Sequence, residues 1–501
     1  MTTARHLLLL LLFGLLAVGC PPTGDDDDSA SDDDDATGDD DDATGDDDDA
    51  TGDDDDSAAL PDTYTFPSRF EAGQDSVSYS GQVVRHVLIH DLKGHIGGMT
   101  DRLNGTGGAP WFPVQGEVED EILFYFAFDS ETSGSIPHGV DTTPAPSQTT
   151  YDDVSSGKDL VGKLAGNDPT GQHRDWSTEF AGWGATGSTT PEDLLMSWFA
   201  ELDAAAIAWS GGTIPTDPQG NPVSDVFVTA QGHDLQQLIQ KFLDAAVGFS
   251  QGADDYLDDD IDGKGLKADN TVADDIGKPY SALEHAWDEG FGYFGATRNY
   301  GDWTDQQLAD EDAQDANGDG AIDLTTEWVK GHAVNAGKRD LGAVVATDFT
   351  QQAWDAFLTG RAIITNADGA LSDEDAGKLG EQRDLALDAW EKAIAATVVH
   401  YINDLLQDIG TYPNEDFGDV AKHWSEMKGF ALAFQFNRRS PMLGEFETLH
   451  DLLGDAPVLS SALQADIDQY TADLRTARGL LHTAYGFDAA NMGDDDGLNG
   501  W

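Results

Sequence analysis

Oxygen-bearing side chains alternate along DANGDGAIDLTTE, residues 315–327. A glycine stands at the sixth position and Ile322 at the hydrophobic eighth, as in a calcium-binding EF-hand loop, whose seventh residue offers its carbonyl. The twelfth position holds Thr326, so either Glu327, one residue late, or Asp312 from before the loop would complete the shell. The alternative is an Asx-rich turn without an ion. The predicted calcium ligands are Asp315, Asn317, Asp319, Ala321, Asp323 and Glu327.

A weaker version of this pattern covers residues 258–269, DDDIDGKGLKAD. Aspartates and Gly263 fall at the right positions, but Gly265 replaces the hydrophobic residue. This favours an acidic loop that holds no ion. Calcium is plentiful outside the cell, so a loop of this kind is expected to stabilise structure rather than to define the function.

Three helical stretches carry a histidine with a carboxylate one turn further on. Spacings of three or four residues put both groups on one helix face, where they can share an ion. Facing helices of a bundle build metal sites from such pairs, and this donor set suits zinc or iron better than calcium. The alternative is core histidines hydrogen-bonded to their neighbours. The predicted metal ligands are His285, Asp288, Glu289, His400, His423 and Glu426.

The candidate around His285 has the most carboxylates. Glu284, Asp288 and Glu289 crowd the histidine next to an aromatic run. Such crowding raises the free energy of the ionised groups unless a cation or solvent relieves it. A metal ion is one cation that would do so.

Hydrophobic periodicity predicts the helices that position these residues. Val84, Leu88 and Leu92 recur at helical spacing, and residues 191–209 and 234–249 are amphipathic. The same three-to-four-residue steps run through 385–406 and 461–487, which keeps the apolar side chains on one face. No comparable run of alternating strand residues occurs. We therefore predict a mostly α-helical bundle with long irregular connections.

The first twenty residues indicate export and lipid attachment. Arg5 precedes an apolar run from Leu7 to Val18, which has the length of a signal-peptide core and is short for a membrane span. The run ends in AVGC, which resembles a bacterial lipobox, and Cys20 is the single cysteine of the chain. Residues 1–19 are thus predicted as a lipoprotein signal peptide and Cys20 as the lipidation site. An ordinary secretory signal or an anchor helix is the alternative.

Residues 20–59 contain repeated Asp tetrads and no apolar seam, so we predict a disordered acidic tether before a folded domain at 60–501. The formal net charge of −69 excludes binding to nucleic acid or anionic lipid by electrostatics. The acidity has two further interpretations, a saline habitat or a cation-binding surface.

The motifs EHAWDEGFGYFG, DANGDGAIDLTTEW and KHWSEMKGFALAFQF, with others in order, resemble a bacterial lipoprotein family catalogued as a domain of unknown function (DUF4856). That family resembles the imelysin-like proteins, exported helical proteins with a Gly-x-His-x-x-Glu motif. The resemblance implies an imelysin-like helical bundle and a role in iron uptake, and some imelysin-like proteins were described as peptidases. His423 and Glu426 match His-x-x-Glu, but Ala421 stands where the glycine would be.

The leading hypothesis is a lipid-anchored cell-envelope protein at the outer membrane, on its periplasmic face or the cell surface. It would bind calcium and iron or zinc, serve metal acquisition and partner an outer-membrane metal-uptake receptor. One alternative is a metal-dependent peptidase or hydrolase with Glu426 or Glu289 as general base. No His-Glu-x-x-His helix supports that alternative. The other alternative is a surface interaction protein without catalytic activity.

Overall fold

Helical spacing of apolar residues accounts for the elements of the folded domain. The computed structural model describes residues 60–133, 135–168, 170–310 and 312–501. Val84, Leu88 and Leu92, which were predicted to share one face, are completely buried in α1. The predicted signal peptide, the lipidation site Cys20 and the acidic tether lie outside the described residues.

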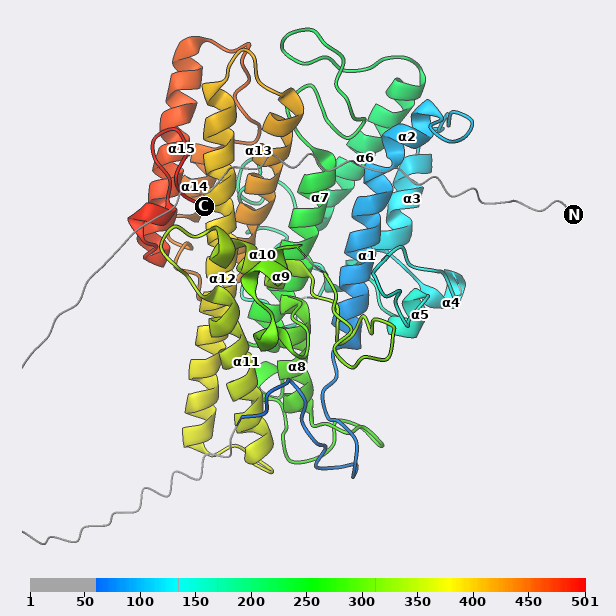
Figure 1. Cartoon of the computed structure of the whole chain (residues 1–501), viewed down its shortest axis with the longest axis vertical. Helices are drawn as coiled ribbons and strands as arrows, with labels where there is room; N and C mark the ends of the chain where they lie inside the picture. The colour runs from blue at the N-terminus through cyan, green and yellow to red at the C-terminus, as the bar shows by residue number, and fades with distance from the viewer. Residues whose placement is uncertain (1–59, 134, 169, 311) are drawn as a thin grey trace, which may run out of the picture. The chain divides into compact units, whose positions relative to one another are not determined.

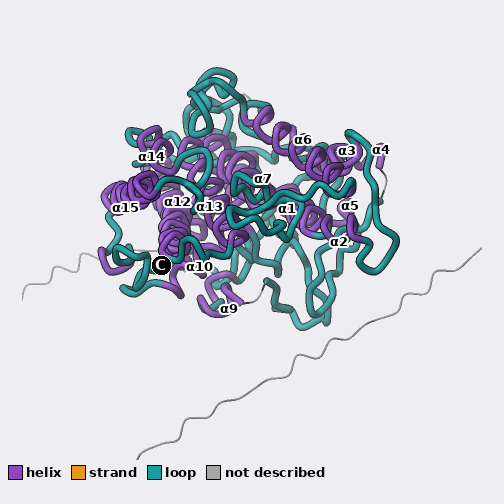
Figure 2. Tube along the Cα trace, turned by 90° about the horizontal axis from the view of Figure 1, so that it is seen from above, coloured by secondary structure: helices purple, strands orange, loops and turns teal. Residues whose placement is uncertain are grey.

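The described residues form fifteen α-helices joined by loops and short 3-10 or π-helical turns (Figure 1). Within these residues no β-strand forms, and the bridges between extended segments are isolated (Figure 2). The predicted mostly α-helical class is therefore confirmed. The helices are α1 (Ser80–Gly97), α2 (Met99–Asn104), α3 (Glu117–Phe126), α4 (Ser130–Ser133), α5 (Tyr151–Val154), α6 (Pro191–Ser210), α7 (Leu235–Leu243), α8 (Ala282–Phe294), α9 (Asp305–Asp310), α10 (Gly331–Gly342), α11 (Phe349–Asn366), α12 (Asp373–Gly410), α13 (Phe417–Ala431), α14 (Phe446–Leu453) and α15 (Gln464–Tyr485).

The helix α12 runs along most of the long axis of the domain (Figure 1). Ser372 is its N-cap, and the Ser372 side chain accepts a hydrogen bond from the Asp375 amide. Three acidic residues occupy the first turn. Both features satisfy the free amides and the dipole at a helix N-terminus. Its buried face, which includes Leu387, Trp390 and Ile394, packs against α11, α13, α10 and α15. This helix thus joins the two ends of the core.

The predicted helix at 234–249 is present, but its geometry changes partway. α7 ends at Leu243, and the chain continues through π-helical turns at Asp244–Phe249 and Gly252–Tyr256. A Cβ atom at Gly252 would lie 2.7 Å from the Trp390 ring, so glycine permits this close approach to α12. Periodicity alone does not show such turns, which occur mostly as single insertions and often at functional sites.

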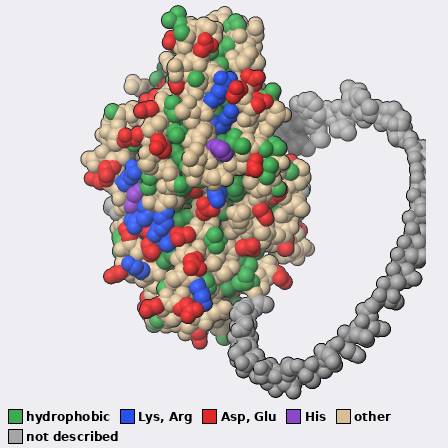
Figure 3. Space-filling view, turned by 90° about the vertical axis from the view of Figure 1, so that its left-hand side faces the viewer, with side chains coloured by type: hydrophobic (Ala, Val, Ile, Leu, Met, Phe, Trp, Pro, Cys, Tyr) green, Lys and Arg blue, Asp and Glu red, His purple; other side chains and the backbone are tan. Residues whose placement is uncertain are grey.

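The helices pack side by side around one hydrophobic core. α1 contacts α3, α7 and α8, α7 contacts α13, and α13 contacts α12. No helix among the described residues is both long enough and apolar enough to span a membrane. On the face drawn in Figure 3, Lys and Arg side chains gather in small groups bordered by Asp and Glu. On this face the basic side chains therefore lie in local groups, and there they can make the electrostatic potential of the acidic surface less negative.

Candidate functional site

The predicted calcium loop is held at both ends by backbone pairing. Ala313 and Trp328 form an antiparallel bridge, and the Val329 amide donates to the Asp312 carbonyl at 2.8 Å. Ile322 is completely buried and exchanges backbone hydrogen bonds with the segment 145–147. The hydrophobic eighth position therefore anchors the loop to the domain, as an EF-hand loop requires.

The first half of the loop wraps around the Asp315 carboxylate. Its Oδ1 accepts from the amides of Gly318 and Asp319 at 2.8 and 3.1 Å, and its Oδ2 accepts from Gly320 at 2.9 Å. Asn317 Oδ1 accepts from the Asp319 amide at 2.8 Å. Gly318 and Gly320 have φ of 72° and 89°, so this tight turn uses the left-handed region that glycine favours.

Glu327, which stands one position after the twelfth position of the loop, folds back into the loop. Glu327 is 3% exposed, and its Oε1 accepts from the amides of Ala316 and Asn317 at 3.1 and 3.2 Å. Its Oε2 accepts from the Asp323 amide at 2.8 Å. The carboxylate thus lies inside the turn although the spacing departs from the standard loop.

Asp323, the predicted ninth-position ligand, already has protein partners. Its Oδ1 accepts from Gln148 Nε2 at 2.7 Å and from the Thr325 hydroxyl at 2.5 Å. The Ala321 amide donates to Asp319 Oδ1 at 3.0 Å. The loop side chains offer oxygen atoms, the ligand type that calcium takes. In the described part of the chain, their carboxylates accept hydrogen bonds from the protein, and no three of them are arranged to hold a metal ion.

The second acidic loop is held by arginines. Asp258 is 2% exposed, and its carboxylate lies 2.9 Å from Arg439 and 3.2 Å from Arg438. Arg438 also pairs with Asp260 at 2.8 Å. These guanidinium groups supply the positive charge for the loop, which supports the ion-free interpretation of residues 258–269.

His285 lies on α8, half-buried. Its Nδ1 is 2.9 Å from the Ser78 carbonyl oxygen, so Nδ1 carries the proton and Nε2 faces Glu289 at 3.7 Å. Glu289 Oε1 also accepts from Gln82 Nε2 at 2.7 Å. The Tyr280 ring stacks on the imidazole with 4.5 Å between centroids. The predicted histidine–carboxylate pair on one helix face is present.

The carboxylates beside His285 have an arginine as their cation. Asp288 and Glu284 are completely buried, and both bind the guanidinium of Arg361, at 2.9 and 3.2 Å. Asp288 also accepts from the Tyr64 hydroxyl at 2.9 Å and from the Ser78 amide at 3.1 Å. Burial nevertheless raises the pKa of Asp288 to about 6. Arg361 therefore provides the charge for which the sequence suggested a metal ion.

The other two predicted histidines, His400 and His423, lie on the adjacent helices α12 and α13. His400 Nε2 is 3.3 Å from Asp404 Oδ2, and His423 Nδ1 is 2.8 Å from Asp408 Oδ2. Burial lowers the pKa of His423, but the hydrogen bond and charge of Asp408 outweigh it and raise the pKa above its usual value. Burial, followed by the charge of Arg339, lowers the pKa of His400 to about 3.

Glu426 faces a lysine rather than its predicted partner. It is 4% exposed, and its Oε1 lies 3.6 Å from Lys241 Nζ on α7. His423, one turn earlier, instead takes Asp408 of α12. Sequence reasoning missed Asp408 because it lies on a different helix.

The predicted metal ligands do not assemble into one site. α8 lies toward the opposite end of the long axis from α13, so His285 is separated from His423 (Figure 1). Within the described ranges, no group of three or more His, Cys, Asp or Glu is arranged to hold a metal ion. The structure thus presents an EF-hand-like loop and separate histidine–carboxylate pairs.

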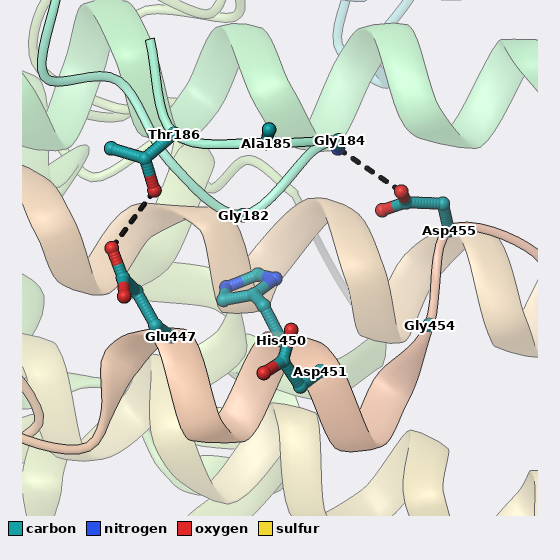
Figure 4. A pocket seen from close by; sticks show the side chains of 9 residues that line it. All are labelled: Gly182, Gly184, Ala185, Thr186, Glu447, His450, Asp451, Gly454 and Asp455. Atoms are coloured by element: carbon teal, nitrogen blue, oxygen red, sulfur yellow. Dashed lines mark hydrogen bonds between the residues drawn. The ribbon is translucent and has the colours of Figure 1, made fainter. Parts of the chain in front are cut away.

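A polar pocket of about 340 Å³ lies between α14 and a glycine-rich loop (Figure 4). The Thr186 hydroxyl donates to Glu447 at 2.8 Å, and the Gly184 amide donates to Asp455 at 3.0 Å across it. His450 is buried there, its Nε2 3.2 Å from the Ala431 carbonyl oxygen. These contacts close the loop onto the α14 region, and Glu447 and Asp455 both accept from protein donors.

The fold and these sites define a helical protein with an EF-hand-like loop. A family model described as "Domain of unknown function (DUF4856)" matches residues 188–480, which is more than half of the chain. The chain belongs to this family. Searches of the curated proteins and of the solved structures found no match.

Proposed function

We propose that this protein is a lipid-anchored binding protein of the bacterial cell envelope whose loop 315–327 holds a structural calcium ion. The observation that carries the calcium assignment is the convergence of Asp315, Asn317 and Glu327 on one tight turn. Calcium binding there would fix the loop ends, and Trp328 follows the loop directly. The anchor would be a lipid on Cys20 at the outer membrane, with the acidic segment 20–59 as tether.

We further propose that its process is the acquisition of iron or another transition metal, through a complex with an outer-membrane receptor and on an imelysin-like fold. The support is the pair of histidine–carboxylate contacts on α12 and α13. Asp408 holds Nδ1 of His423 and leaves Nε2 as the atom that a metal would use. A carboxylate that orients a histidine in this way is common behind metal ligands.

A hydrolase is less well supported by the geometry. That alternative needs Glu289 or Glu426 as a general base beside a metal-bound water. Glu289 accepts from Gln82 at 2.7 Å, and Glu426 lies 3.6 Å from Lys241. Both carboxylates thus have protein partners already.

Elemental analysis by mass spectrometry tests the proposal. The exported full-length protein, purified without a histidine tag, would be measured before and after mild EDTA. The proposal predicts one calcium per chain in wild type and its loss in Asp315→Asn/Asp319→Asn. It also predicts an iron or zinc ion that His423→Ala removes and that the control His482→Ala, on α15, keeps.

Calcium alone, unchanged by His423→Ala, would leave the histidines as structural groups and overturn the metal-acquisition part. Failure to find calcium in the folded wild-type protein would overturn the calcium assignment.

A further inference from the structure

Four lysines line one pocket in a chain that has 26 basic residues against 95 acidic ones. The pocket, of about 270 Å³, opens where α1, α7 and α10 meet the segment that follows the calcium loop. Its volume lies just below the range of roughly 300–1,000 Å³ that is usual for small-molecule sites, so it suits a small ligand. The lysines are Lys93 of α1, Lys241 of α7, Lys338 of α10 and Lys330, just before α10.

Two of the four lysines are built into the wall. Lys330 is 4% exposed, and its ammonium donates to the Trp328 carbonyl at 2.7 Å. Lys241 is 8% exposed, donates to Gln240 Oε1 at 2.9 Å and lies 3.6 Å from Glu426. Burying a charged side chain costs free energy, so the fold holds these groups in place with specific partners.

The other two lysines have no such partners. In the part of the chain that the structure describes, neither Lys93 nor Lys338 forms an ion pair or a hydrogen bond through its ammonium group. Burial and then the charge of Lys241 lower the pKa of Lys93 to about 8, and the same two causes lower the pKa of Lys338. Lys241 repels both cations, and a bound anion would relieve that repulsion.

The acidic groups at the pocket leave Lys93 and Lys338 unpaired. Asp244 lies at the first π-helical turn and accepts from Gln240 Nε2 at 3.3 Å. Asp312 is exposed at the rim. Neither carboxylate forms an ion pair with a lysine of the pocket in the described part of the chain. Glu426 acts through its charge on both lysines from beyond ion-pair distance, so among the described residues direct contact with the two ammonium groups is left to a ligand.

Polar residues, namely His86, His90, Gln240 and Asn335, form part of the remaining wall, and apolar side chains form another part. Ile89 and Val334, from α1 and α10, line the pocket together with Trp328 and Val329. A wall of this kind favours a ligand with an apolar body, whereas a fully hydrated inorganic anion gains nothing from it. Lysine ammonium groups bind anionic oxygen as point charges.

We propose that this pocket binds a small organic acid, with its carboxylate at Lys93 and Lys338 and its apolar part against Trp328 and Val334. The site uses none of the histidines of α12 and α13 on which the proposed metal acquisition rests, although Lys241 in its wall lies 3.6 Å from Glu426. Binding would place a carboxylate at the two unpaired ammonium groups.

Isothermal titration calorimetry of the full-length protein at neutral pH tests this, with phenylacetate as probe. Inorganic phosphate presents the anion without an apolar body, and 2-phenylethylamine presents the ring with the opposite charge. We expect phenylacetate to bind more tightly than either. In Lys93→Met/Lys338→Met its affinity should fall by about tenfold or more, as expected for lost hydrogen bonds to a charged group.

The matched control is Lys378→Met/Lys392→Met, which removes the same charge from α12, where each lysine pairs with an acid one turn away. Its affinity for phenylacetate should equal that of wild type. If the test variant does not fold, Lys338→Met alone decides, because Lys338 is more exposed than Lys93. The proposal is overturned if the test and control variants bind phenylacetate equally well. It is also overturned if wild type binds 2-phenylethylamine as tightly as phenylacetate, or binds phosphate more tightly.

Discussion

Asp288 Oδ1 accepts a hydrogen bond from Nε of Arg361 at 2.9 Å, and both side chains are completely buried. Arg361 also binds Glu284 and the Ser76 hydroxyl, so one guanidinium joins α8, α11 and the segment before α1. A buried ion pair adds little net stability, but removing one partner leaves an uncompensated charge.

Arg361→Met should therefore destabilise the domain by about 3–5 kcal/mol, because two buried carboxylates lose their cation. Urea unfolding measures the change. Lys392→Met, which breaks an i,i+4 pair at the surface, should cost less than about 1 kcal/mol. Equal stability of Arg361→Met and wild type would show that Asp288 has another source of compensation.

Gly360 of α11 is required by the packing of α8. A Cβ atom there would lie 2.0 Å from the Trp287 ring, which is fixed by a hydrogen bond from its Nε1 to the Phe357 carbonyl at 2.9 Å. Gly360→Ala should cost about 1–3 kcal/mol or more through overpacking. The control Gly377→Ala meets no atom within 4 Å on α12 and should instead stabilise by about 0.5–1 kcal/mol. Thermal unfolding that ranks the two variants in reverse would refute this packing.

Buried carboxyls should make the domain less stable as pH rises toward neutrality. Glu391 is buried on α12 and accepts from Ser440, Tyr485 and Asn437. Burial outweighs these hydrogen bonds and raises its pKa to about 7. The folded state then binds the proton more tightly than the unfolded state. The stability that this tighter proton binding gives the folded state is fully present below the unfolded pKa of about 4.3. It is lost as the pH rises through the folded pKa of about 7.

Glu391→Gln stays neutral at every pH, so its unfolding free energy should fall less steeply than that of wild type between about pH 5 and 7. Urea unfolding at several pH values measures both slopes. Repulsion among the many acidic groups acts on wild type and variant alike and cancels in the comparison. The exposed Glu445→Gln should keep the wild-type slope, and an equally steep slope in Glu391→Gln would contradict the assignment.

Local patterns predicted the longer amphipathic helices, such as α6, α12 and α15, but not the contacts between residues far apart in the chain. The spacing of Leu387, Trp390 and Ile394 reflects burial on one face of α12, which is a local property. Arg361 lies 73 residues after Asp288 in the chain, so no periodicity could reveal that it is the cation of that cluster. For the same reason the lysine pocket, built from α1, α7 and α10, was not predicted.

Calcium titration by isothermal calorimetry of EDTA-treated full-length protein tests the central claim most directly. Wild type should bind one calcium per chain. The control variant Asp262→Asn should do the same, because the Asp262 side chain in the second acidic loop is 99% exposed. Asp315→Asn/Asp319→Asn should bind it at least about tenfold more weakly, because two anionic ligands are lost. Wild-type protein that binds no calcium, or a double variant that binds it as tightly as wild type, would contradict the account.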